Sequence, residues 1–141
     1  MVAQILYATG ALPLILLGGM HLFYTLKDNK APRFIVPRSP ELIRKMQTEP
    51  LRLSSETDMW RAWIGFNISH SMAVLLVGTG YLYLALMHFP LLRNDIMMLW
   101  TAPALAWVFV ILSKCFWFSK PLYGSFVSAL LFTSGALIGS L

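Results

Sequence analysis

The sequence predicts an all-α integral membrane protein with four transmembrane helices in an antiparallel up-down bundle. Of its 141 residues, 57% are hydrophobic and only 12% are charged, against about 45–50% and about 25% in soluble domains. The uncharged residues form four runs, each long enough to cross a bilayer core about 30 Å thick. Backbone groups in lipid must be paired within their own segment, so spans of this length are helices. Short connections make consecutive helices antiparallel.

The same composition excludes several other classes of protein. A single cysteine, Cys115, forms no intramolecular disulfide, which excludes a disulfide scaffold. The high hydrophobic content excludes intrinsic disorder and the usual soluble, basic nucleic-acid modules. We therefore expect the lipid bilayer, and no nucleic acid, as a partner.

The four expected spans cover residues 3–26, 60–89, 95–118 and 121–141. The first span has no positively charged n-region, and its apolar run exceeds the roughly 7–15 residues of a signal peptide, so we expect it to be retained. Pro90 marks the end of the second span, because proline interrupts a helix. The fourth span contains no charged side chain.

The distribution of basic residues predicts the orientation. Between the first two spans the sequence holds eight of them, whereas the next connection holds only Arg93; the eight are Lys27, Lys30, Arg33, Arg38, Arg44, Lys45, Arg52 and Arg61. Because short loops rich in Lys and Arg stay in the cytoplasm, we expect the connection at 27–58 to face inward. Both termini would then face outward.

Two helix starts are expected near this connection. The run Ser39-Pro40-Glu41 provides an N-cap, a proline for the first turn and an acid near the positive end of a helix. With Leu42, Ile43 and Met46 on one face, it predicts a short amphipathic helix at about 40–47, lying on the lipid headgroups; a solvated basic loop is the alternative. The run Ser55-Glu56-Thr57-Asp58 resembles a capping box and predicts that the second long helix begins near Glu56.

Small residues follow single faces of two spans. Ala62, Gly65, Ser69 and Ala73 do so in the second span, and Gly135 and Gly139 do so in the fourth. Small side chains let helix backbones approach closely in lipid. We expect these faces to pack inside the chain, with a partner protein as the alternative.

The polar residues within the spans are the candidate site. His21 precedes Lys27 by six residues, and His70 follows Trp63 by seven, so both imidazoles are expected at roughly 9–11 Å depth in the same leaflet. Trp63, Asn67 and His70 follow one helical stripe, and Thr25, Ser69 and Ser71 lie nearby.

Two interpretations of this cluster remain open. We favour an interhelical hydrogen-bond cluster in which His21, His70 and Asn67 satisfy one another. The alternative is a ligand site. Imidazole is a common axial ligand of haem iron, so a b-type haem held by one histidine from each helix is possible chemistry, and a quinone, a lipid or a metal ion are further candidates.

No sequence feature indicates catalysis. The central parts of the spans lack Asp, Glu, Lys and Arg, and the chain has no phosphate-cradling loop, no G-x-S-x-G, no H-E-x-x-H and no C-x-x-C. We therefore expect a non-catalytic small membrane protein, a subunit or accessory factor that binds other membrane protein subunits. A redox or ligand-binding protein that uses His21 and His70 is the alternative.

Three motifs together resemble an uncharacterised family of small bacterial four-helix integral membrane proteins. They are Gly18-x-x-His21, Met59-Trp60-x-x-Trp63-Ile64-Gly65-Phe66-Asn67-x-Ser69-His70 and Trp117-Phe118-x-x-Pro121. The resemblance covers nearly the whole chain and implies the fold and the membrane location. It implies no activity and no ligand.

Overall fold

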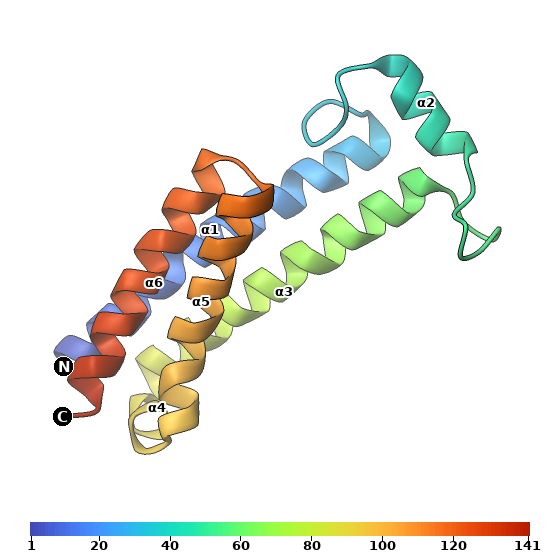
Figure 1. The fold of residues 1–141 in the computed structure, drawn as a ribbon. Coiled ribbons are helices and arrows are strands. Elements are labelled where there is room, and N and C mark those ends of the chain that lie inside the picture. Colours follow the sequence, from blue (N-terminus) through green and yellow to red (C-terminus); the bar gives the residue numbers. More distant parts are fainter. The chain divides into compact units, whose positions relative to one another are not determined.

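The computed structural model describes residues 1–141 as an all-helical chain, 82% helical and without strands. Four of its helices are long and apolar enough to cross a membrane: α1, α3, α5 and α6. The prediction of an all-α chain with four candidate spans is therefore confirmed. The helices, drawn in Figure 1, are α1 (Val2–Lys30), α2 (Pro40–Thr48), α3 (Met59–Met87), α4 (Phe89–Asn94), α5 (Ile96–Phe116) and α6 (Ser119–Gly139).

The chain around Pro90 differs from the expectation. The second span was expected to reach residue 89, but α3 ends at Met87 and the short helix α4 follows. Pro90 lies in the first turn of α4, where its fixed φ suits a helix and its missing N–H costs nothing. The proline therefore begins a new helix after the break at His88.

The start of α3 also differs from the expectation near Glu56. The helix begins at Met59, and the Asp58 Oδ1 atom accepts a hydrogen bond from the backbone N–H of Arg61 at 2.7 Å. The preceding residues fold back on themselves, because the Met59 N–H donates to the Glu49 carbonyl at 3.0 Å. Asp58 thus caps the helix, and the run that begins at Ser55 lies in a loop.

By its internal contacts the chain divides into two compact units. We call residues 1–17 and 74–141 the terminal unit, and residues 18–73 the connection unit. The helices α1 and α3 each contribute one segment to each unit.

The core of the terminal unit surrounds the buried ring of Tyr7. Its centroid lies 5.4 Å from the ring of Phe132 and 6.2 Å from that of Phe89, and its hydroxyl donates to the Leu99 carbonyl. Small residues let α6 approach α1 here. At Gly135 an added Cβ would lie 2.8 Å from the Tyr7 Cδ2 atom, so the small-residue face of α6 packs inside the chain as expected.

The small-residue face at the start of α3 does not pack inside the chain. Gly65 has no neighbouring atom within 4 Å of the position that a Cβ would take. Ser69 and Ala73 are exposed, and so is the neighbouring Phe66, at 68%. The expectation of internal packing is therefore wrong for this face, because its residues Gly65, Ser69 and Ala73 are exposed.

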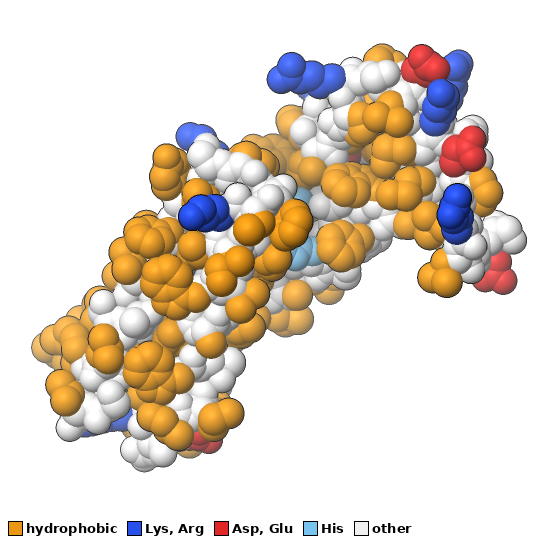
Figure 2. All heavy atoms as spheres, in the orientation of Figure 1, with side chains coloured by type: hydrophobic (Ala, Val, Ile, Leu, Met, Phe, Trp, Pro, Cys, Tyr) orange, Lys and Arg blue, Asp and Glu red, His pale blue; other side chains and the backbone are white.

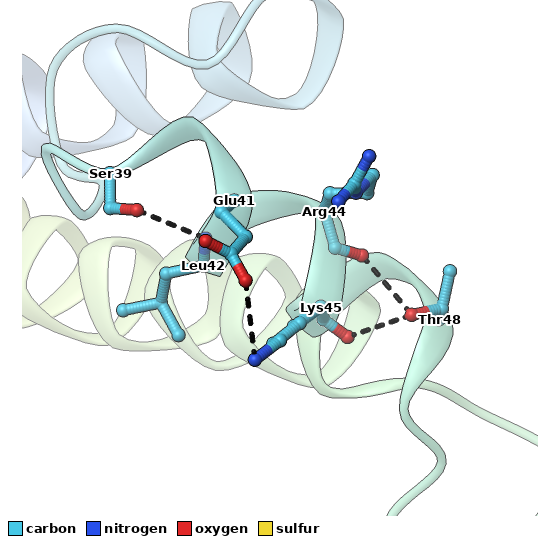
Figure 3. A network of polar contacts seen from close by, with 6 residues as sticks. All are labelled: Ser39, Glu41, Leu42, Arg44, Lys45 and Thr48. Carbon is cyan, nitrogen blue, oxygen red and sulfur yellow. Dashed lines mark hydrogen bonds and ion pairs between the residues drawn. The ribbon is translucent and has the colours of Figure 1, made fainter.

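In the connection unit, α2 lies where the Ser39-Pro40-Glu41 run predicts a helix. The Ser39 hydroxyl accepts a hydrogen bond from the Leu42 N–H at 3.3 Å, and Glu41 pairs with Lys45 at 3.4 Å. At the other end, the Thr48 hydroxyl donates to the Arg44 carbonyl at 3.2 Å (Figure 3). No residue of α2 is buried, so its own local bonds define this helix.

Candidate functional site

The two imidazoles that are expected at equal depth lie next to each other in the connection unit. His21 comes from α1 and His70 from α3, and their ring centroids are 5.6 Å apart with an angle of 74° between the planes. The rings therefore meet edge to face. Both side chains are half-buried, which leaves part of the pair accessible from outside the chain.

A serine hydroxyl determines which nitrogen of His21 carries the proton. The Ser71 hydroxyl donates to the Asn67 carbonyl at 2.7 Å, and the same oxygen lies 3.2 Å from the Nδ1 atom of His21. A hydroxyl has one hydrogen and two lone pairs. Because the hydrogen is used toward Asn67, the Nδ1–H of His21 donates to Ser71. A neutral His21 then carries an unprotonated Nε2 atom that can accept a hydrogen bond.

Asn67 belongs to the same cluster. Its side chain is 6% exposed and lies within hydrogen-bonding reach of the His21 imidazole. One N–H of the amide donates to the Trp63 carbonyl at 2.7 Å. The structure thus brings His21, His70, Asn67 and Ser71 together.

The indole of Trp63 bonds to the loop after α1. The indole N–H donates to the Ile35 carbonyl at 3.1 Å, and the backbone carbonyl of Trp63 accepts a hydrogen bond from the Asn67 side chain. The indole therefore ties the loop after α1 to the start of α3. The sequence predicted a stripe of Trp63, Asn67 and His70, but a bond to a residue 28 positions away is not visible in a helical pattern.

The histidine pair fits a hydrogen-bond cluster better than a haem. With iron about 2 Å from each nitrogen, two axial imidazoles would have centroids about 6 Å apart, with the flat macrocycle between them. The observed 5.6 Å is near that value. However, Ser71, the residue after His70, bonds directly to His21, so the helices are close where the macrocycle would need space.

A second polar centre, around Asp28, was missed in the sequence. Asp28 is 1% exposed, although it follows the first expected span, residues 3–26, directly in the basic connection. Its Oδ1 atom accepts hydrogen bonds from the N–H groups of Arg33 and Phe34, both at 2.8 Å, and its Oδ2 atom accepts one from Ile35 at 2.6 Å. Hydrogen bonds to an ionised carboxylate are the stronger kind. Residues 31–35 are thereby folded against the end of α1.

Other chemistry-bearing groups do not join these centres. No group of three or more His, Cys, Asp or Glu side chains could hold a metal ion, and Cys115 is exposed and free. Comparison of the chain with protein-family models, curated proteins and solved structures found no match. The resemblance to small bacterial four-helix membrane proteins therefore remains a prediction.

Proposed function

We propose that this chain is a small integral membrane protein of the bacterial inner membrane, and that it works as a non-catalytic accessory subunit of a larger membrane assembly. Apolar side chains support the insertion. Only 22–39% of the most apolar window of each long helix is buried inside the chain. Figure 2 displays hydrophobic side chains over the visible face of α5 and α6, whereas charged side chains gather around α2. Lipid is the solvent that suits such exposed helix surfaces.

Contacts within the terminal unit support an antiparallel order of the spans. As residue numbers along α1 increase, the numbers of the residues that they contact on α6 decrease. An added Cβ at Gly139 would lie 3.8 Å from Ala3, and one at Gly10 would lie 3.1 Å from Phe132. On α3, Ala85 accepts a hydrogen bond from the side chain of Gln4 at 2.9 Å. Helices that cross the bilayer in alternation meet in this way.

The basic residues support an orientation with both termini outside. Eight of them lie between Lys27 and Arg61, and Lys114 and Lys120 flank the junction of α5 and α6 on the same side. The connection between α3 and α5 holds only Arg93. Positively charged loops remain in the cytoplasm during insertion.

The uncovered small-residue face of α3 carries the accessory-subunit proposal. Gly65, Ser69 and Ala73 follow one another at four-residue intervals and are exposed, and no atom lies within 4 Å of the position that a Cβ at Gly65 would take. In lipid, such a face lets another helix approach closely and gain packing contacts. The proposed partner is a transmembrane helix of another subunit.

Site-specific photo-crosslinking in native membranes tests this role. A crosslinking residue at Ser69 should give a defined protein adduct, and Gly65→Leu should abolish it, because the larger side chain blocks close approach. The matched control is Ile111, which is 59% exposed on α5 and should crosslink mainly to lipid. Lipid adducts alone at both positions would refute the accessory role.

The histidine cluster favours a second candidate function, the binding of a lipid-soluble small molecule. The unprotonated Nε2 atom of His21 can accept a hydrogen bond. It therefore suits a ligand that donates one, such as the hydroxyl of a reduced quinone or of a lipid headgroup. Mass spectrometry of an organic extract of the purified protein should identify the ligand, and His21→Phe should lose it. A haem absorption band in the visible spectrum would instead establish haem, and an unchanged extract would refute this candidate.

A further inference from the structure

The surface around α2 carries positive charge that acidic side chains do not cancel. Between residues 27 and 61 all eight basic side chains are exposed. Three of the five acidic residues are occupied inside the unit: Asp28 by three backbone N–H groups, Asp58 by the cap of α3 and Glu41 by Lys45. We call the exposed side chains of Lys30, Arg33, Arg38 and Arg44 the basic surface.

The helix α2 adds an apolar side to the basic surface. Leu42, Ile43 and Met46 lie on one face of the helix, and Leu42 is 47% exposed. Arg44 and Thr48 project from a different face, as seen in Figure 3. A short helix with this division suits the boundary between headgroups and acyl chains.

The connection is held close to the ends of the helices that it joins. Asp28 binds residues 33–35 to the end of α1, and the rings of Tyr24 and Phe34 stack with centroids 4.8 Å apart. The Trp63 indole binds Ile35 from the side of α3. If α1 and α3 cross the bilayer, these bonds keep residues 33–35, and with them Arg33, at the headgroups of the leaflet where the two helices emerge.

We propose that the basic surface binds anionic phospholipid headgroups, with the apolar side of α2 lying toward the acyl chains. The guanidinium groups of Arg38 and Arg44 match a phosphate in shape and charge. Two N–H groups on one edge of a guanidinium group can donate to two phosphate oxygens. This inference rests on the membrane insertion proposed above. It adds a preference for lipid charge that insertion alone does not require.

Spin labels on the full-length protein in vesicles test the position of α2. In a Cys115→Ser background, labels are placed at Leu42→Cys, at Thr48→Cys on the opposite side of α2, and at Ile111→Cys on the exposed side of α5. The vesicles contain phosphatidylcholine alone or equal parts of phosphatidylcholine and phosphatidylglycerol. In the anionic vesicles the Leu42 label should gain contact with oxygen and lose contact with a polar nickel reagent, whereas the Thr48 label should remain in contact with water.

The lipids retained after detergent purification test the preference for charge. The wild-type protein should retain more phosphatidylglycerol than its share of the vesicle. The double variant Arg38→Gln, Arg44→Gln should bring the retained ratio of phosphatidylglycerol to phosphatidylcholine back toward that of the vesicle, by a factor of up to about five for each charge removed. The matched control Arg38→Lys, Arg44→Lys keeps the charge and should keep most of the enrichment.

The outcomes separate this inference from the membrane proposal. A water-exposed label at Ile111 would refute the insertion itself. An Ile111 label in lipid, with no enrichment of phosphatidylglycerol or with equal enrichment in the glutamine variant, would overturn the lipid inference alone. Protection of the Leu42 label in native membranes but not in either vesicle would overturn it in favour of an acidic protein partner.

Discussion

Replacing Asp28 with alanine should release residues 31–35 from the end of α1. The wild-type carboxylate accepts three backbone hydrogen bonds, at 2.8, 2.8 and 2.6 Å, and is buried to 1% exposure. A hydrogen bond to a charged group contributes about 1.5–3 kcal/mol. Arg33 and Phe34 are exposed, so their freed N–H groups can bind water, and the low end of this range applies.

Three bonds at the low end amount to roughly 4.5 kcal/mol of local stability. Each 1.4 kcal/mol corresponds to a factor of ten, so the protection of these amides against hydrogen exchange should fall by about a thousandfold. The change should be local, because the bonds join only Asp28 to residues 33–35. Exchange measured residue by residue by NMR in nanodiscs would report it. The indole resonance of Trp63 should also shift, because its acceptor is Ile35.

The variant Asp28→Asn is the matched control. Its side chain has the same shape and keeps one carbonyl oxygen, which can still accept the bonds from Arg33 and Phe34. Its NH₂ group cannot accept the bond from Ile35, so the Ile35 amide should lose the most protection. Wild-type protection of all three amides in Asp28→Ala would refute the reasoning, and so would equal losses at all three in Asp28→Asn.

Packing inside the terminal unit gives two further predictions. Gly135→Ala should lower the free energy of unfolding by about 1–3 kcal/mol, because the new Cβ would meet the buried ring of Tyr7. Gly65→Ala is the control: its new Cβ would have open space around it, so the variant should be neutral or stabilising by up to about 1 kcal/mol. Equal effects of the two variants on detergent unfolding would contradict this. Ser128→Ala should cost about 0.6–1.7 kcal/mol, because it removes a buried hydrogen bond of 2.8 Å to the Gly10 carbonyl. An unchanged midpoint of unfolding would exclude a contribution from that bond.

The candidate site could be predicted in part. The expected depths of His21 and His70 paired two residues 49 positions apart, and the structure places their rings 5.6 Å from each other. The roles of Ser71 and of the Trp63 indole could not be predicted, because they depend on the rotation of one helix against its neighbours. A polar residue on a helix has several possible partners until that rotation is set.

The sequence by itself determined the four apolar helices and the start of α2. The preference of a segment for lipid is a sum over its own residues, and the Ser39 cap acts within one turn, so both signals are local. Tertiary structure decided which small residues are covered. A pattern of small residues does not distinguish Gly65 from Gly135. Yet no atom lies within 4 Å of a Cβ built at Gly65, whereas a Cβ built at Gly135 would meet the ring of Tyr7. Tertiary structure also decided the role of Asp28. The three N–H groups that bond to its carboxylate lie in a loop without a regular sequence pattern. The carboxylate avoids the cost of burial only after that loop has folded around it.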